Sequence, residues 1–139
     1  MILEVTTNSA VETEAVGQSL ARSLPPGTVL AFTGDLGAGK TTFTRGLARG
    51  LGITMPVTSP TYTIVNEYPG LIHFDMYRLG GADELFEIGW EDYLAQNAVL
   101  AVEWSENVAE ALPPDTVRVQ IETLNETSRK IIITGLGED

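Results

Sequence analysis

Apolar residues recur at helical spacing twice in the first third of the chain. The earlier stretch starts at Ser9, where Ser-Ala-Val-Glu has the form of a helix-capping box, and Pro25-Pro26-Gly27 is expected to end it. The later stretch covers residues 42–51 and is followed by Gly52, a residue suited to a helix C-terminus. Residues 28–33 form a short apolar run between the two. This order predicts a helix, a strand and a second helix.

The rest of the chain favours strands, with Pro, Gly and polar clusters between them. Residues 62–68 and 71–75 are joined so tightly by Pro69-Gly70 that two strands there must pair antiparallel. The later patterns predict a helix over 82–95 that is broken or bent near Gly89, a buried strand over 98–103, a helix over 105–112 that Pro113-Pro114 stops, and two closing strands over 117–122 and 130–134. We therefore expect a single three-layer α/β domain over residues 1–139, of the P-loop NTPase-like kind. Its mixed and mainly parallel central sheet is flanked by helices.

The segment between the first predicted strand and the second predicted helix carries the most specific motif. Its residues match the pattern G-x-x-x-x-G-K-[ST]: Gly34, Asp35, Leu36, Gly37, Ala38, Gly39, Lys40 and Thr41. Glycine permits backbone conformations in which successive N–H groups turn toward phosphate oxygens, and the following helix adds its partly positive N-terminus. Lys40 offers a point charge to the β- and γ-phosphates, and Thr41 offers a hydroxyl to Mg²⁺. The motif predicts a protein that binds a nucleoside triphosphate.

Two acidic residues stand at the ends of apolar runs, where a phosphate-binding loop requires carboxylates. Asp75 ends the run that begins at Leu71, and Glu103 ends the run that begins at Val99. Since the carboxyl ends of parallel strands meet at one edge of a sheet, both residues are expected to face the ligand and to organise Mg²⁺ and water. The alternative is that one or both merely cap the turn that follows.

Several other residues allow two interpretations each. His73 lies on the same side of its predicted strand as the aspartate that follows, and a structural role is favoured over proton transfer. Arg45 and Arg78 are candidates for an arginine finger, although Arg45 is better explained as a surface residue of its helix. Trp104 either packs in the core, which is favoured, or stacks on a base. Residues 58–61 either contact a γ-phosphate as a switch loop does or form a Ser-Pro turn.

Composition and charge restrict the class of protein. An apolar content of 43% and a charged content of 19% are typical of a globular chain, and the absence of cysteine excludes disulfides and cysteine-based metal sites. The balance of 19 acidic against 8 basic residues gives a net charge of −11, which opposes a large nucleic-acid-binding surface. Solubility explains this acidity better than a basic partner does. No run approaches the roughly 20 apolar residues of a membrane span, and the N-terminus lacks a basic signal region, so we expect a cytoplasmic protein with no membrane attachment.

Five segments in this order resemble the TsaE (YjeE) family of ATPases in bacterial tRNA threonylcarbamoyladenosine synthesis. They are Gly-Asp-Leu-Gly-Ala-Gly-Lys-Thr-Thr-Phe at 34–43, Ser-Pro-Thr-Tyr-Thr-Ile-Val-Asn-Glu-Tyr at 59–68, His-Phe-Asp-Met-Tyr-Arg-Leu at 73–79, Glu-Ile-Gly-Trp-Glu-Asp-Tyr at 87–93 and Val-Glu-Trp-Ser-Glu at 102–106. The phosphate loop is shared by many families. The third and fifth segments together are much more particular to this one.

The resemblance implies a small Mg²⁺-dependent ATPase that supports two partner proteins, TsaB and TsaD. That machinery places a threonylcarbamoyl group on adenosine 37 of tRNAs that read codons beginning with A. The TsaE protein does not transfer the group itself, and tRNA reaches it only through the complex. ATP and Mg²⁺ are the implied cofactors, and a partner that carries the tRNA accounts for the acidity of this chain.

The resemblance also implies roles for individual residues. Lys40 would hold phosphate, Thr41 would bind the metal, and Asp75 and Glu103 would form the acidic pair for Mg²⁺ and water. Trp104 and Glu106 would flank the site, and Ser9 and Arg129 would lie near the adenine. Thr42 beside the loop and Thr61 in the switch-like segment are also expected to bind the nucleotide.

Two other functions compete with this interpretation. A small-molecule kinase uses the same loop, but no arginine cluster suited to a phosphate lid occurs between residues 80 and 130. A regulatory module that binds ATP and signals by shape, with incidental hydrolysis, stays open. ATP is favoured over GTP because the chain has no N-K-x-D guanine signature.

Overall fold

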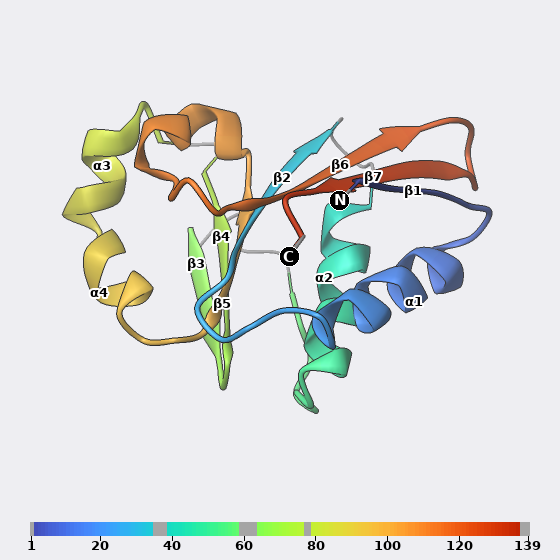
Figure 1. The fold of residues 1–139 in the computed structure, drawn as a ribbon, viewed down its shortest axis with the longest axis horizontal. Coiled ribbons are helices and arrows are strands. Elements are labelled where there is room, and N and C mark those ends of the chain that lie inside the picture. The colour runs from blue at the N-terminus through green and yellow to red at the C-terminus, as the bar shows by residue number, and fades with distance from the viewer. Residues whose placement is uncertain (1, 35–38, 59–63, 77–78, 137–139) are drawn as a thin grey trace.

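A single seven-stranded sheet runs through the molecule (Figure 1). The structure is a computed structural model that describes residues 2–34, 39–58, 64–76 and 79–136. The strands are β1 (Ile2–Thr7), β2 (Val29–Gly34), β3 (Val65–Tyr68), β4 (Leu71–Asp75), β5 (Val99–Glu103), β6 (Val117–Thr123) and β7 (Arg129–Thr134). Their order is β1-β7-β6-β2-β5-β4-β3. The four middle strands, β6, β2, β5 and β4, run parallel, and the outer pairs are antiparallel.

Helices cover both faces of this sheet. They are α1 (Ala10–Ala21), α2 (Lys40–Gly50), α3 (Ala82–Glu87), α4 (Trp90–Leu94) and the 3₁₀ helix η1 (Ser105–Ala111). One core cluster contains Leu20 and Phe43 from α1 and α2, and a second contains Leu85, Trp90 and Val108 from α3, α4 and η1. Figure 1 shows α1 and α2 apart from α3 and α4, with strands between them. The predicted three-layer α/β architecture with a mixed sheet that is parallel in its middle is therefore confirmed.

Most predicted elements occur near their predicted positions, with four differences. The sequence pattern missed β1, because five of its six residues are exposed and its partner is β7 at the other end of the chain. Helix α1 ends at Ala21, before the predicted stop at residues 25–27, although Leu24 still packs against the core. Residues 105–111 form a 3₁₀ helix. The predicted strand over 62–68 is observed as β3, and residues 62 and 63 lie outside the described residues.

Two predicted helix boundaries have clear physical causes. The Ser9 side chain accepts a hydrogen bond from the Glu12 backbone N–H at 3.1 Å, as the capping box requires. The Glu12 carboxylate in turn accepts from the backbone N–H of Asn8 at 2.8 Å, one residue earlier than that motif expects. At Gly89 the backbone has φ +97°, and this left-handed residue separates α3 from α4 as predicted.

Helices α1 and α2 touch backbone to backbone through glycine. A Cβ atom on Gly46 of α2 would overlap the carbonyl oxygen of Glu14 in α1, and one on Gly17 would overlap the carbonyl oxygen of Phe43. The Arg49 guanidinium and the Glu14 carboxylate, 2.5 Å apart, add an ion pair between the same helices. This contact fixes the N-terminus of α2 relative to that of α1.

Replacement of Gly46 by alanine should therefore destabilise the fold. We expect Gly46→Ala to lower the free energy of unfolding by about 3 kcal/mol, because the helices must separate to admit the methyl group. Chemical denaturation measures this change. Gly52→Ala is the matched control, since Gly52 has φ +83° but nothing within 4 Å of its Cβ position, and it should cost only about 1 kcal/mol of backbone strain. Equal losses in the two variants would contradict close helix contact.

Candidate functional site

The candidate site begins where β2, the central strand, ends. Leu30, Ala31 and Phe32 of β2 are fully buried, and the strand pairs in parallel with β5 on one side and β6 on the other. At its end Gly34 has φ +140°, and a Cβ atom there would overlap the carbonyl oxygen of Ile121 in β6. Gly39, with φ +103°, precedes α2. The backbone thus favours glycine at both of the motif's described glycine positions, Gly34 and Gly39.

Lys40 is held at the start of α2 by contacts that an anion can replace. The residue is 5% exposed, and its Nζ donates to the carbonyl oxygen of Gly34 at 3.3 Å. The same ammonium lies 4.6 Å from the centre of the Trp104 ring, within the range of a cation–π contact. The remaining loop residues, Asp35, Leu36, Gly37 and Ala38, lie outside the described residues, so their phosphate contacts stay predictions.

Asp75 and Glu103 end neighbouring parallel strands at the same level. They are paired in the register of β4 and β5, and they are 8% and 6% exposed. Side chains alternate along a strand, and Leu71 in β4 belongs to the core cluster under α1 and α2, whereas Phe74 belongs to the opposite one. Asp75 therefore projects from the face that α2 covers. The structure brings the two acids to one edge of the sheet.

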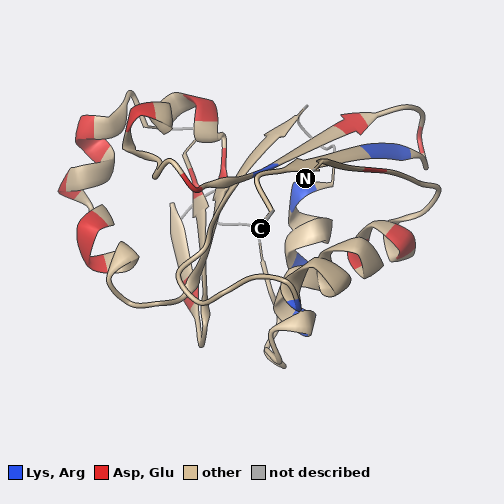
Figure 2. Cartoon of the chain, in the orientation of Figure 1, with Lys and Arg blue, Asp and Glu red and all other residues tan. Residues whose placement is uncertain are grey.

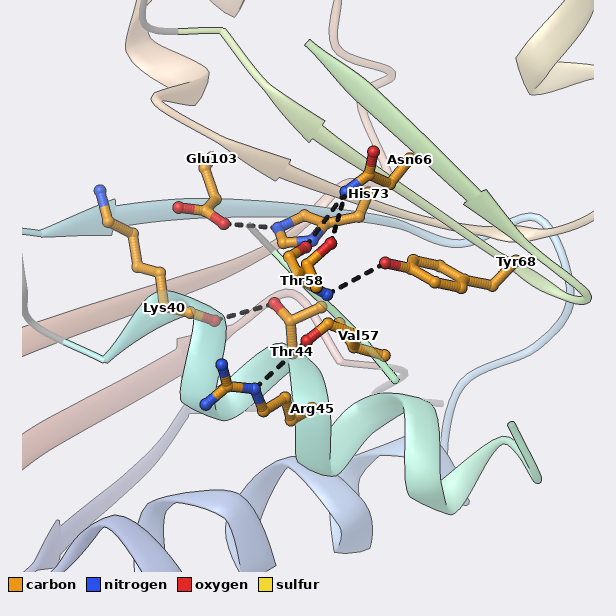
Figure 3. A network of polar contacts seen from close by, with 9 residues as sticks. All are labelled: Lys40, Thr44, Arg45, Val57, Thr58, Asn66, Tyr68, His73 and Glu103. Atoms are coloured by element: carbon orange, nitrogen blue, oxygen red, sulfur yellow. Dashed lines mark hydrogen bonds and ion pairs between the residues drawn. The ribbon is translucent and has the colours of Figure 1, made fainter. Parts of the chain in front are cut away.

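His73 lies on the same face as Asp75 and forms a pair that sequence reasoning missed. Its Nε2 and the Oε2 of Glu103 are 2.5 Å apart, and the histidine is fully buried (Figure 3). The two residues are 30 positions apart, and His73 is opposite Ala101 in the register of β4 and β5. A strand pattern gives the face on which His73 lies, but only the pairing of β4 with β5 brings the two side chains together.

On the other side of the loop, four predicted residues border one cavity. Ser9 at the start of α1, Thr42 of α2 and Arg129 of β7 line a cavity of about 330 Å³, which Gly39 also borders. The turn before β7 is fastened to the α1 cap, because the Ser128 hydroxyl donates to the side-chain oxygen of Asn8 at 2.9 Å. Glu126 in that turn lines the cavity too, and no motif identified it from the sequence.

The other predicted residues have mixed outcomes. Trp104 is partly buried against the core cluster under α3 and α4, and its ring also lies beside the Lys40 ammonium. Glu106 is exposed on η1 and lines a different cavity of about 490 Å³ between η1 and α3. Arg45 is exposed and donates to the carbonyl oxygen of Val57 at 3.3 Å, as expected of a surface residue. Thr61 and Arg78 lie outside the described residues.

Thr58 is anchored to β3 just before residues 59–63, which the structure does not describe. The Tyr68 hydroxyl accepts from the Thr58 backbone N–H at 3.2 Å, and the Asn66 amide donates to the Thr58 carbonyl at 3.1 Å (Figure 3). These two bonds fix one end of the predicted switch-like segment.

The donor set suits Mg²⁺ bound together with phosphate. In the part of the chain that the structure describes, no three His, Asp or Glu side chains gather as a metal cage would require. Mg²⁺ typically keeps waters and takes one or two protein carboxylates besides phosphate oxygens. Asp75, Glu103 and the Thr41 hydroxyl fit that pattern, and Lys40 supplies positive charge beside them. None of the described helices combines the length and apolar character needed to cross a membrane.

Basic residues are unevenly distributed over the fold. Residues 80–117 contain no Lys or Arg, and acidic residues recur along α3, α4 and η1 (Figure 2). Basic residues occur on α2 and β7 instead, among them Lys40 and Arg129. An anionic ligand is therefore favoured on the α2 and β7 side.

The fold and the loop after β2 define a P-loop NTPase-like α/β domain. A family model described as "Threonylcarbamoyl adenosine biosynthesis protein TsaE" matches residues 7–131. A Bacillus subtilis (strain 168) protein named "tRNA threonylcarbamoyladenosine biosynthesis protein TsaE" is 42% identical over 130 residues, which cover 91% of this chain and 81% of the relative. A protein of the same name from Treponema pallidum (strain Nichols) is 39% identical over 130 residues, which cover 91% and 96%.

A solved structure agrees with these relatives. The crystal structure of Bacillus subtilis YdiB superposes with a TM-score of 0.83 at 37% identity, covering 99% of this chain and 87% of that one. The chain belongs to the TsaE family, and the resemblance found in its motifs is confirmed.

If Lys40 is the phosphate-binding lysine, its loss should nearly abolish nucleotide binding. We expect Lys40→Ala to weaken ATP binding about 100-fold or more, because a charge-assisted contact in a buried site contributes up to about 3 kcal/mol. Isothermal titration calorimetry with ATP and Mg²⁺ measures the change. Lys130→Ala removes the only other lysine, which lies on β7 with Nζ 3.8 Å from Glu4, and it should bind ATP as the parent does. Unchanged affinity in folded Lys40→Ala would contradict the assignment.

Proposed function

We propose that this protein is a Mg²⁺-dependent ATPase of tRNA threonylcarbamoyladenosine biosynthesis in the cytoplasm. It would support the TsaB–TsaD pair in modifying adenosine 37 of tRNAs that read codons beginning with A, without transferring the group itself. The observation that carries the proposal is the convergence of Lys40, Asp75 and Glu103 at one edge of the sheet in a chain of the TsaE family.

The phosphate-binding half of the proposed site rests on Lys40 and on the N-terminus of α2. The lysine is nearly buried, and its present partner is a neutral carbonyl oxygen. A triphosphate would replace that partner with a charged one and form a stronger bond. The first backbone N–H groups of α2 have no hydrogen-bond partners within the helix. Like the Lys40 ammonium, they would face the bound phosphates.

The metal-binding half rests on Thr41, Asp75 and Glu103. Bound Mg²⁺ would neutralise charge on the β- and γ-phosphate oxygens. Asp75 and Glu103 would hold the metal and its waters and would orient a water molecule for attack on the γ-phosphate. Both carboxylates are more than nine-tenths buried, so they would act on the metal and the water largely shielded from bulk solvent.

The base would occupy the cavity bordered by Ser9, Thr42 and Arg129. A cavity of about 330 Å³ next to the loop is suited to a purine, and its hydroxyl, carboxylate and guanidinium groups offer both donors and acceptors. ATP is proposed over GTP because the chain lacks the guanine signature.

Asp75→Asn and Glu103→Gln should fold and bind nucleotide yet lose most hydrolysis. Each amide keeps the shape of the side chain but removes the charge that organises metal and water, so we expect kcat to fall about 100-fold. Steady-state phosphate release with TsaB–TsaD present measures the effect. Glu91→Gln makes the same chemical change on the exposed face of α4 and should leave the rate unaltered. Parental rates in both site variants would remove the two acids from the mechanism.

The partner proteins should accelerate hydrolysis. A small NTPase that leaves transition-state charge partly uncompensated is slow alone, and a group supplied in trans raises such rates by about 10³-fold or more. We expect purified TsaB–TsaD to stimulate phosphate release and to bind this chain more tightly with ATP than with ADP. Equal rates with and without the partners, together with association that ignores the nucleotide, would overturn this role. Tight ATP-dependent association without stimulation would favour the regulatory module.

A further inference from the structure

His73 and Glu103 form a buried pair that joins two strands at the candidate site. The ring of His73 is fully buried, and the Glu103 side chain is 8% exposed. The backbone at His73 is paired on both sides, with Asn66 of β3 and with Ala101 of β5. A ring so enclosed has little freedom to turn, whereas a glutamate has three rotatable side-chain bonds. The histidine is the fixed member of the pair.

The direction of the hydrogen bond follows from the partners. An ionised carboxylate only accepts, so Nε2 of His73 donates to Oε2 of Glu103. The other ring nitrogen, Nδ1, is buried and has no hydrogen-bond partner among the described residues. A buried N–H without a partner is costly, and a bare nitrogen is less so, which assigns the ring proton to Nε2. The ring thus directs one donor at one oxygen of Glu103.

We propose that His73 is a positioning residue that fixes the carboxylate of Glu103 for the bound metal and its water. With Oε2 engaged, the second oxygen points away from the ring, toward the side on which Lys40 lies (Figure 3). Without the His73 donor, the carboxylate is free to rotate and to pair with the Lys40 ammonium, which would occupy both groups that the nucleotide needs. Hydrogen bonds that orient a metal-binding side chain typically change metal affinity or activity 10- to 100-fold. This inference rests on the proposed function.

Two substitutions of His73 by carboxamide residues distinguish a hydrogen-bond donor role of the histidine from a packing role. His73→Gln places an amide N–H₂ near the position of Nε2, and His73→Asn places the same group short of it, near Nδ1. We expect His73→Asn to lower the kcat of partner-stimulated ATP hydrolysis about 10- to 100-fold while the KM for ATP changes less than about threefold. His73→Gln should stay within about threefold of the parent in kcat. If His73→Asn does not fold in thermal melting, His73→Met, which fills the space without a donor, replaces it.

A second readout does not depend on catalysis. Mn²⁺ binding in the presence of ADP, followed by the electron paramagnetic resonance signal of free Mn²⁺, should weaken about tenfold in His73→Asn and recover in His73→Gln. Ile72→Val is the matched control, since Ile72 is the preceding residue on β4, belongs to the opposite core cluster and lacks any polar group. It should leave both readouts unchanged.

The outcomes are distinct. Reduced kcat and weaker Mn²⁺ binding in His73→Asn, with both near the parental values in His73→Gln, support the inference. Parental kcat and Mn²⁺ binding in both variants, or equal losses in both, overturn the inference. The proposed function still stands in that case if the parent binds Mn²⁺ with ADP and hydrolyses ATP. A parent that does neither removes the proposed function, and the inference with it.

Discussion

The arrangement of the site depends on β2 being the central strand of the sheet. Parallel strands flank it on both sides, and its side chains are buried beneath helices on each face, so its end has a fixed position. At that end the chain passes close to the backbone of β6. Only glycine fits at position 34, because a Cβ atom there would overlap the carbonyl oxygen of Ile121. The loop and the N-terminus of α2 are therefore placed by the sheet.

Two further sets of contacts complete the site around that point. In-register pairing of β4 with β5 brings Asp75 and Glu103 to one level, and His73 forms a hydrogen bond with the Glu103 carboxylate. On the opposite side, the glycine contact between α1 and α2 places Ser9 beside Thr42, and the bond from Ser128 to Asn8 brings the turn before β7 to the same cavity. Each half thus rests on contacts between segments that are distant in sequence.

The sequence was informative where function and structure are local. The α1 cap and the break at Gly89 were predictable, because each depends on residues within one or two turns, and the phosphate-loop motif is equally local in sequence. The ends of β4 and β5 were predictable as well, since each strand is a short apolar run that stops at a carboxylate. Strand β1 was not predicted, because it is a short edge strand whose apolar residues are exposed and whose partner is at the far end of the chain. The His73–Glu103 pair escaped for a related reason: it requires the register of two strands, which no local pattern contains. The separation of Glu106 from the Ser9 cavity also depends on the packing of η1 against α3.

A nucleotide and its metal are expected to share one site at the carboxyl ends of β2, β4 and β5. A crystal structure of the protein with ADP and Mg²⁺ tests it most directly. We expect the β-phosphate within hydrogen-bond distance of Lys40 Nζ and the base in the cavity bordered by Ser9 and Arg129. Mg²⁺ should lie about 2.1 Å from the Thr41 hydroxyl, on the side of Asp75 and Glu103. A nucleotide bound elsewhere, or a metal held without any of these three residues, would contradict the account.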